Sequence, residues 1–401
     1  MNVELFAYPW DILDRGPEAF AEECLALGVG RIHVATLYHS GKFLLPHNRT
    51  TKVYFPEPGH LFVPLAFEKF PKCLRPKISG IASSDWFDRL CKTASDSGIR
   101  LAAWTVFHHS STLAGEHPEY AIRNIFGDVY PFALCPSHAA VREYGVALAS
   151  AIRSLGVFES LDLETIGYLG YSHGHHHEVT AIPVGVLENF LLSLCFCPAC
   201  CSLGEQNGIN AEALRRDLQR LLMHKLNSDD SAAGHPDNVE QLVTLMALSE
   251  PLQQFIRVRL KNVSGLIQEI RSAHGGPQSI FSSSFVGSPS NIWMEGVSLP
   301  DVQQSTDVFY LLAYTADTDA VNGDLTFCLS QVQDPLRLNL TLNLGLPITP
   351  TRGHAEAKIE YAWRQGVRDF AFFNYGLLGN ARLKWIQQIS EDLRRREALI
   401  E

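Results

Sequence analysis

The sequence predicts a closed (β/α)8 barrel, and two observations carry this prediction. Eight short apolar, β-rich segments recur along the 401 residues, and most of them are followed by a segment with a helical pattern. Alternating strands and helices favour a parallel sheet with helices outside, and eight is the number of strands that closes such a sheet. An open doubly wound sheet is the alternative. No glycine-rich fingerprint follows any strand, so nothing supports a nucleotide-binding version of it.

The predicted elements follow in chain order. The strands span residues 2–8, 31–38, 100–107, 158–165, 278–286, 307–314, 337–345 and 368–376. A helix over 17–27 has Pro17 in its first turn and ends near Gly28, as helices often do. Another helix covers 84–97, and Ser137 is the expected N-cap of a helix that ends at Gly156. An amphipathic helix is predicted from Asn380 onward.

Two connections are longer than ordinary barrel loops. Residues 40–80 form a long loop after the second strand, expected on the substrate side. Residues 183–274 predict a helical insertion after the fourth strand, broken by a polar segment at 227–238. We expect one barrel over 1–401, with the insertion either covering the mouth or carrying a contact between two copies of the chain.

Composition excludes several classes of protein. The net charge of −10 argues against nucleic-acid binding, since no Lys/Arg block offsets the acidic balance. No apolar stretch reaches the ~20 residues of a membrane span, and the first residues lack the pattern of a secretory signal. The nine cysteines, an odd number, then favour reduced thiols. We therefore expect a cytoplasmic protein that needs no cofactor.

The predicted strand ends carry a mixture of side chains that suits sugars. Active sites of such barrels lie at the carboxyl ends of the strands. Flat rings pack on the C–H faces of a sugar, and fixed polar groups bind its hydroxyls. The predicted sugar pocket consists of Trp10, His39, Trp104, His108, Asn343, Asn374 and Tyr375. In the loop over 40–80, Arg49 either meets a carboxylate of an acidic saccharide or belongs to an ordinary surface loop.

Asp162 and Glu164 at the end of the fourth strand are the sharpest signal. Residues two apart on a strand face the same side, so both acids are expected to point into the barrel. Two acids in one low-dielectric site push their pKa values apart, which lets one stay protonated as a general acid. The alternative is that one acid pairs with a buried basic residue, although no basic residue ends a neighbouring strand.

The Asp-x-Glu pair at 162–164, followed by Tyr314 in "LLAYTAD", is similar to the chitinase-like family. The segments at 117–144, 195–201 ("CFCPACC") and 372–378 ("FFNYGLL") resemble those of poorly characterised glycoside-hydrolase-like barrels. The resemblance implies a glycosidase in which Glu164 is the general acid/base. It also implies that Asp162 is its orienting partner and that Tyr314 serves the anomeric centre.

The sequence also departs from the large retaining clan of glycoside hydrolases. That clan has its nucleophilic Glu at the end of strand seven, where this chain has Asn343. A second carboxylate must come from elsewhere, and Asp317 after strand six is the first candidate. The next candidates are Asp319, Glu295 and Asp11. Otherwise the mechanism is substrate-assisted, with Asp162 orienting a substrate group and Tyr314 steadying it.

Two other functions stay open. A metal-dependent sugar isomerase or epimerase would use a mixed nitrogen and oxygen site. Its ligands would be His39, one of His108 and His109, Asp162 and Glu164. The missing acid on strand seven would suit a carbohydrate-binding barrel without activity. We favour the glycosidase interpretation, in which the expected partner is a small glycoside or oligosaccharide. We also expect the chain to self-associate through the insertion.

Two clusters carry metal-ligating side chains. The segment "HGHHHEV" (173–179) fits a polar lid or adventitious metal binding better than a designed site. The segment "CFCPACC" offers thiolates at zinc-like spacing, but only one knuckle is visible in the sequence. Reduced thiols at a helix end are the favoured interpretation, so no metal is predicted. The residues that could complete a zinc site are Cys73, Cys135 and His177.

Overall fold

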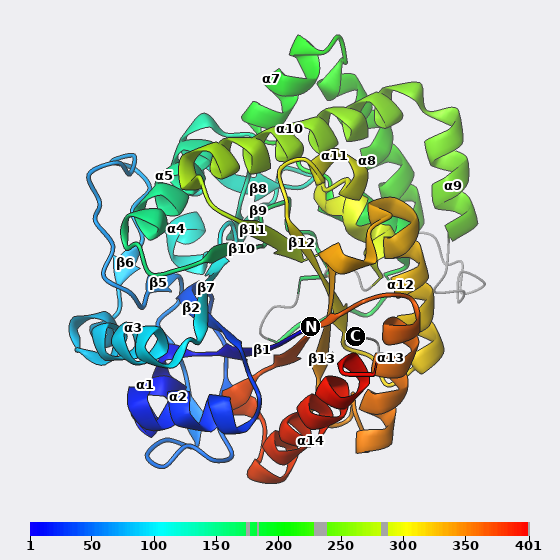
Figure 1. Ribbon diagram of the computed structural model, residues 1–401. Coiled ribbons are helices and arrows are strands. Elements are labelled where there is room, and N and C mark those ends of the chain that lie inside the picture. Colours follow the sequence, from blue (N-terminus) through cyan, green and yellow to red (C-terminus); the bar gives the residue numbers. More distant parts are fainter. Residues whose placement is uncertain (174–176, 183, 228–238, 282–287, 400–401) are drawn as a thin grey trace.

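The computed structural model describes residues 1–173, 177–182, 184–227, 239–281 and 288–399, and its centre is a parallel barrel (Figure 1). Each of the eight barrel strands pairs with its neighbours in chain order, and the last pairs with the first. The strands are β1 (Asn2–Ala7), β2 (Arg31–Tyr38), β7 (Arg100–Val106), β10 (Ser160–Glu164), β11 (Gln278–Phe281), β12 (Val308–Ala313), β13 (Leu338–Asn343) and β14 (Asp369–Phe373). The predicted (β/α)8 barrel is confirmed. Residues 282–286 of the predicted fifth strand lie outside the described residues.

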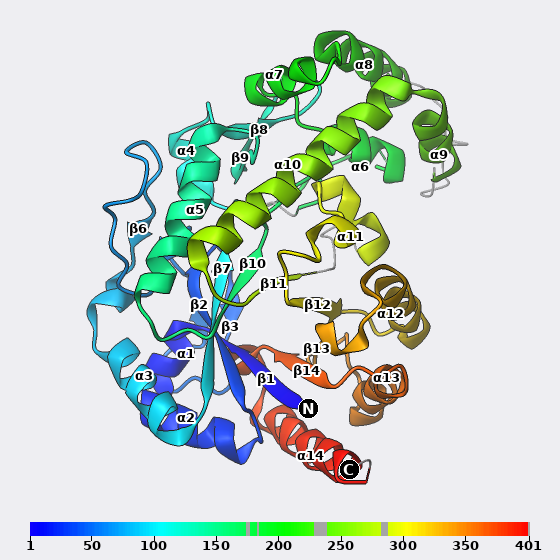
Figure 2. The same ribbon diagram turned by 45° about the horizontal axis from the view of Figure 1, so that its top comes forward.

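The helices surround the barrel and cover its apolar outer face (Figures 1 and 2). The helices of the outer ring are α2 (Pro17–Ala26), α3 (Trp86–Ser97), α5 (Ala139–Ser154), α10 (Glu250–His274), α12 (Thr318–Val332), α13 (Arg352–Arg364) and α14 (Asn380–Glu397). The first residue lies beside the end of α14, since the N-terminal ammonium of Met1 donates a hydrogen bond of 2.6 Å to Oε1 of Glu397. The predicted cap at Ser137 is wrong. His138 occupies the N-cap of α5, and the Ser137 hydroxyl lies 2.8 Å from that of Tyr168.

The loop over 40–80 folds back onto the barrel. Strand β5 (His60–Leu61) pairs with the end of β2 in the antiparallel sense, and β6 (Lys77–Ile78) lies beside it. The other short elements between β1 and β10 are α1 (Pro9–Arg15), β3 (Phe43–Leu44), β4 (Val53–Tyr54), η1 (Gly80–Ser83), α4 (Ser111–Glu116), β8 (Ala121–Arg123) and β9 (Val129–Leu134). The chain after β2 is therefore anchored along the strand that leads to the barrel mouth.

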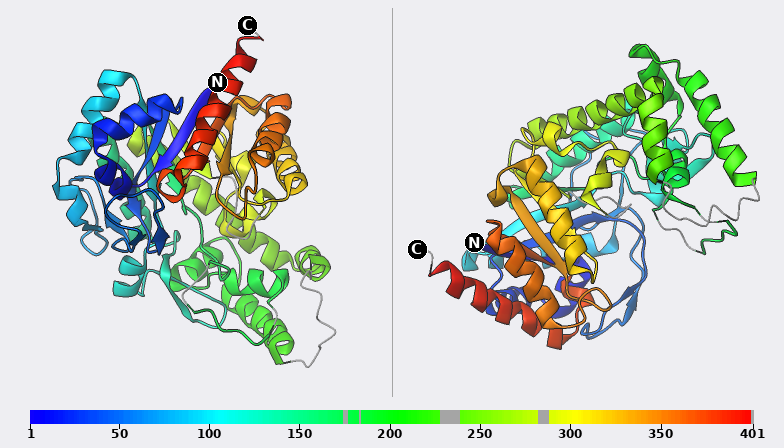
Figure 3. Two further views of the ribbon diagram at one scale, coloured as in Figure 1. Left: turned by 90° about the horizontal axis from the view of Figure 1, so that it is seen from below. Right: turned by 90° about the vertical axis from the view of Figure 1, so that its right-hand side faces the viewer.

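Between β10 and β11 the chain forms a group of helices that extends away from the barrel (Figure 3). They are α6 (Val186–Ser193), α7 (Pro198–Gln206), α8 (Ala211–Asn227), α9 (Val239–Leu248) and the long α10, which packs along α5 on its way back. No single described helix is long and apolar enough to cross a membrane; α6 and α7, bent by 90°, pass that test only as a pair. The elements after β11 are η3 (Pro289–Glu295), α11 (Leu299–Val302), η4 (Pro335–Arg337) and η5 (Tyr375–Leu377).

A buried ionic network fills the barrel interior below its mouth. Nδ1 of His33 lies 2.6 Å from Oδ2 of Asp162, and its Nε2 lies 2.9 Å from Oε2 of Glu4. Tyr310 and Asn339 each donate a further hydrogen bond to Glu4. Burial lowers the pKa of His33, but the two carboxylates outweigh it and raise that pKa to about 9. The network therefore holds a positive imidazolium between two acids in the core.

Candidate active site

A cavity of about 380 Å³ opens among the carboxyl ends of the barrel strands. This volume lies within the range of small-molecule sites. Aromatic rings form much of its wall, and two carboxylates line it. The lining side chains that carry aromatic or titratable groups are Tyr38, His39, Trp104, Glu164, Phe281, Glu295, Tyr314 and Phe373. Four of the predicted site residues, namely His39, Trp104, Glu164 and Tyr314, thus meet in one cavity.

Glu164 is the last residue of β10, and its carboxyl group faces this cavity. Burial raises the pKa of Glu164 to about 7, while the hydrogen bond from the Trp104 indole lowers it and the charge of Asp162 adds to the rise. A carboxyl group with this pKa is partly protonated at neutral pH, so it can donate a proton as a general acid. Nε1 of Trp104 donates to Oε2 and fixes the orientation of the group.

The backbone next to Glu164 is strained. Thr165 has a φ of 55°, in the left-handed region that β-branched residues rarely adopt. The surrounding chain holds it there, since the amide of His108 donates to the Thr165 carbonyl (3.2 Å) and that of Phe107 donates to the Glu164 carbonyl (2.9 Å). Strain of this kind clusters at functional sites. Here it sets the direction in which the chain leaves β10 directly after the acid.

Glu295 supplies the second carboxylate of the cavity. It ends η3, and its backbone carbonyl accepts a hydrogen bond of 2.8 Å from the amide of Tyr168 in the loop after β10. This close approach depends on Gly167, because a Cβ there would lie 2.2 Å from the Glu295 carbonyl oxygen. The contact between the β10 loop and η3 therefore brings a carboxylate from beyond the fifth strand to the same cavity as Glu164.

The aromatic walls are packed against one another rather than scattered. Trp104 contacts Tyr38 with ring centroids 4.9 Å apart and Phe373 at 5.7 Å, and Tyr314 contacts Phe373 at 5.5 Å. Burial raises the pKa of Tyr314 well above its usual value, so its hydroxyl stays protonated and can donate. Such a wall offers flat faces with a few hydrogen-bonding groups, which is the kind of surface that binds sugar rings.

Imidazoles border the cavity on one side. Nδ1 of His39 donates to the Ser40 carbonyl at 2.6 Å, so its Nε2 is an acceptor in the neutral ring. Burial lowers the pKa of His39 to about 4, and this ring stays neutral at pH 7. It stacks on His109 at 4.3 Å, and Nε2 of His109 lies 3.1 Å from Nε2 of His173. These rings form a neutral polar edge. The sequence had grouped His39 with one of His108 and His109 as ligands of the alternative metal site, but it had not joined His173 to them.

Asp162 has a structural environment. It is fully buried, its Oδ2 contacts His33, and its Oδ1 accepts a hydrogen bond of 2.5 Å from the Ser279 hydroxyl. It does not line the cavity, and it affects Glu164 only through its charge. Asp162 therefore follows the alternative from the sequence, in which one of the two acids pairs with a buried basic residue. The base, His33, lies in the middle of β2 rather than at a strand end.

Asp317 lies apart from the cavity. It is exposed and forms the N-cap of α12, where its Oδ1 accepts from the amides of Asp319 (2.9 Å) and Ala320 (3.1 Å). The side chain thus satisfies two amides at the helix start and does not line the cavity that holds Glu164. Of the candidates for a second carboxylate, only Glu295 lines that cavity.

The other predicted pocket residues lie outside this cavity. Trp10 stacks on Tyr8 at 4.4 Å in an aromatic cluster, and Nδ1 of the buried His108 faces the Gly167 carbonyl at 3.4 Å. The side chains of Asn343 and Asn374 cap local turns through the amides of Gly345 (2.8 Å) and Gly376 (3.0 Å). These four side chains thus support the strand ends rather than the cavity wall.

Arg49 and Tyr375 line a different cavity, of about 500 Å³, together with Asp11. Some of its polar side chains are paired with one another. Arg49 pairs with Asp14 at 3.6 Å, and the hydroxyl of Tyr375 donates to Oε2 of Glu23 at 2.9 Å. A sugar would have to displace these contacts, which makes this cavity the weaker candidate.

The mixed nitrogen and oxygen metal site does not form among the described residues. Within them, ligand atoms from three or more His, Cys, Asp or Glu side chains converge only at a group of cysteines. Of the histidine-rich segment 173–179, residues 174–176 lie outside the described residues. The aromatic residues of the cavity outside the predicted site are Tyr38, at the end of β2, and Phe281 and Phe373, the last described residues of β11 and β14. All three follow the strand-end rule, and earlier strand boundaries would have found the two phenylalanines.

The barrel is similar to those of several solved glycoside hydrolases. It matches a β-galactosidase from the psychrophilic Marinomonas ef1 with a TM-score of 0.58 and 13% identity, over 100% of this chain and 60% of that one. It matches the catalytic domain of a β-amylase from Paenibacillus polymyxa with a TM-score of 0.59 and 10% identity, over 98% of both chains. For α-L-fucosidase isoenzyme 2 from Paenibacillus thiaminolyticus the values are 0.54 and 11%, over 100% of this chain and 50% of that one.

No protein-family model and no curated protein sequence matches the chain. The chain spans 60% of the length of the β-galactosidase and half of that of the fucosidase. At these identities the similarity concerns the fold. The chain therefore shares the (β/α)8 barrel fold of these enzymes.

Proposed function

We propose that the protein hydrolyses the glycosidic bond of a small glycoside or oligosaccharide, with Glu164 as the proton donor. The observation that carries the proposal is the environment of Glu164, a half-buried carboxyl group at a strand end that lines the cavity and whose pKa is raised to about 7 by desolvation. The aromatic walls and the neutral His39 of the same cavity support a sugar as the ligand. A cavity of about 380 Å³ supports a small glycoside over a polymer.

In the proposed mechanism, protonated Glu164 gives its proton to the leaving oxygen while the glycosidic bond breaks. Glu295 is the second carboxylate, acting on the other side of the anomeric carbon as nucleophile or as the base that activates water. Tyr314 donates a hydrogen bond to the sugar beside the reacting centre. This assignment replaces Asp317 with Glu295, since Glu295 lines the cavity.

The test is hydrolysis of a panel of aryl α- and β-glycosides by the wild type and three variants. We expect Glu164→Gln to lower kcat/KM by about 10²–10⁴-fold, because a general acid contributes this much. The loss should be larger for a phenyl than for a dinitrophenyl leaving group, which needs little protonation. Glu295→Gln should lose activity for every leaving group, and Asp317→Asn, the matched control, should keep it.

Several results would contradict the proposal. Full activity in Glu164→Gln would remove the proton-donor role, and equal losses for both leaving groups would make Glu164 a positioning residue. A larger loss in Asp317→Asn than in Glu295→Gln would exchange the roles of these two acids. Sugar binding by the wild type without turnover on any substrate would favour a carbohydrate-binding barrel. The observation that supports this second candidate is Asn343, an amide at the end of the seventh barrel strand, where retaining enzymes have a nucleophilic carboxylate.

A further inference from the structure

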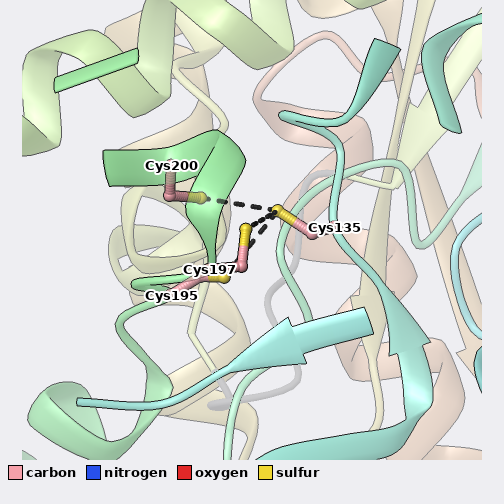
Figure 4. Close-up of side chains that lie close together, drawn as sticks. All are labelled: Cys135, Cys195, Cys197 and Cys200. Carbon is pink, nitrogen blue, oxygen red and sulfur yellow. Dashed lines mark hydrogen bonds between the residues drawn. The ribbon is translucent and has the colours of Figure 1, made fainter. Parts of the chain in front are cut away.

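Four cysteines from two distant parts of the chain converge in one buried cluster (Figure 4). Cys135 follows β9, whereas Cys195 and Cys197 lie between α6 and α7, and Cys200 is in the first turn of α7. The Sγ atom of Cys135 lies 3.4 Å from that of Cys200, 3.6 Å from that of Cys197 and 3.7 Å from that of Cys195. All four sulfur atoms lie within 4.8 Å of one another.

This arrangement has the dimensions of a tetrahedral thiolate site. Zinc–sulfur bonds of about 2.3 Å place the corners of a tetrahedron about 3.8 Å apart. The three separations from Cys135 are within 0.4 Å of that value. Disulfide bonds would join the cysteines only in pairs, whereas here one sulfur has three near neighbours. We propose that Cys135, Cys195, Cys197 and Cys200 bind one Zn²⁺ ion.

The surroundings of the cluster fit thiolate ligands. The backbone amide of Arg123 donates to Sγ of Cys195 at 3.4 Å, and amides that point at sulfur are typical outer partners of a metal thiolate. Cys197 is the N-cap of the nine-residue helix α7, whose N-terminal dipole favours negative charge. All four cysteines are buried, so an ion would be shielded from water.

Four protein ligands leave no open coordination position, which makes the site structural rather than catalytic. None of the four cysteines lines the cavity of Glu164. Cys135 belongs to the connection between β7 and β10, whereas the other three belong to the helical insertion. The ion would thus attach the base of the insertion to the barrel. The sequence alone revealed only the cluster of cysteines at 195–201, because the fourth ligand, Cys135, lies 60 residues before Cys195.

The test is the metal content of protein purified without chelator, and it does not depend on the proposed glycosidase activity. We expect about one zinc ion per chain, and a tetrahedral cobalt–thiolate absorption spectrum after exchange with Co²⁺. Cys135→Ser and Cys200→Ser should each reduce zinc affinity by at least about tenfold. Cys201→Ser is the matched control. Cys201 follows Cys200 in α7, but its thiol donates to the Phe196 carbonyl (3.4 Å) and lies outside the cluster.

Wild-type measurements keep the proposal falsifiable where a variant fails to fold. Thiol alkylation of the native protein should spare these four cysteines until a chelator removes the metal, and mass spectrometry identifies them. Protein that contains no metal and binds neither Zn²⁺ nor Co²⁺ would overturn the proposal. So would iron as the resident metal, a disulfide within the cluster, or equal loss of zinc from Cys201→Ser and Cys200→Ser.

Discussion

Asp162 and Glu164 stand two positions apart on one strand, yet their environments are opposite. Asp162 is held by the imidazolium of His33 and the hydroxyl of Ser279, so its negative charge is compensated in the core. Glu164 receives a hydrogen bond from Trp104, but burial dominates and disfavours its ionised form. The period of a strand predicts that both face inward, but it cannot predict how deep each one lies. That depth separates a structural acid from a candidate catalytic acid.

The first prediction is that Glu164→Gln stabilises the protein at high pH. Because the pKa of Glu164 rises from 4.5 to about 7 on folding, the folded state binds the proton more tightly than the unfolded state. This contribution to stability is fully present below pH 4.5 and is lost as the pH rises through 7. The glutamine carries no such penalty, so at pH 8 its free energy of unfolding should exceed that of the wild type by about 3 kcal/mol. Denaturant unfolding at pH 4 and pH 8 measures it, and an equal difference at both would refute the explanation.

The second prediction concerns Asp162→Asn, which should destabilise the protein. The change leaves the buried His33 with only Glu4 as a charged partner, and breaking a buried pair costs about 3 kcal/mol. The same denaturant experiment at pH 6 measures the loss. At a temperature where the variant is folded, its kcat/KM should fall far less than that of Glu164→Gln. Unchanged stability together with lost activity would return Asp162 to the catalytic role that the resemblance implied.

At the scale of elements, the contact between η3 and the loop after β10 builds the candidate site. The Tyr168 amide binds the Glu295 carbonyl at 2.8 Å, and Gly167 leaves room for that approach. Neither Tyr168 nor Gly167 carries a sequence signal that predicts this contact, because a lone glycine after a strand has many explanations. This is why sequence reasoning favoured Asp317, which is near a strand end in the chain, over Glu295, which reaches the cavity through a tertiary contact.

The third prediction is that Gly167→Ala displaces Glu295 and lowers activity. Its Cβ would lie 2.2 Å from the Glu295 carbonyl oxygen, so η3 must move. We expect a loss of stability of about 1–3 kcal/mol and a fall in kcat/KM of up to about 10²-fold, the cost of a displacement near 1 Å. Gly323→Ala is the control. It lies within α12 with nothing within 4 Å of the added Cβ, so it should stabilise the protein by about 0.5–1 kcal/mol. Full activity in Gly167→Ala would show that the position of Glu295 is unimportant.

The barrel elements themselves were well predicted, because the strands are short segments rich in apolar and β-branched residues and most of them are followed by a helical pattern. The limits of prediction are local. The fourth strand begins at Ser160 rather than at residue 158, where Phe158 packs on Phe87 outside the sheet. The two-residue strands β5 and β6 were not predicted, since so short a segment has no period to detect.

At the scale of the whole molecule, what the sequence could not predict is long-range proximity. The strand-end rule found Glu164, Trp104, Tyr314 and His39, because parallel strands bring their carboxyl ends to one edge. It could not reveal that Cys135 meets the cysteines of the insertion, or that His33 meets Asp162 across the barrel. Each of these contacts joins segments that are 60 or more residues apart.

The fourth prediction is that the chain self-associates through the helical insertion. Large apolar side chains are exposed there on α8 and α9, with Met223 49% exposed, Val243 60% and Leu248 82%. We expect these exposed side chains to pack against a second copy of the chain, which offers the same side chains in return. The net charge of −10 opposes association, so dimers should be favoured as salt screens the repulsion.

Light scattering over a range of protein and salt concentrations measures this association. The molar mass should approach twice that of one chain at high concentration, and Val243→Lys should return it to that of the monomer. Leu346→Lys, in the connection between β13 and α13, is the matched control, because its side chain is 71% exposed but belongs to the barrel. A dimer that survives Val243→Lys and is lost in Leu346→Lys would place the interface on the barrel. A monomer under all conditions would leave the insertion as a cover for one side of the barrel.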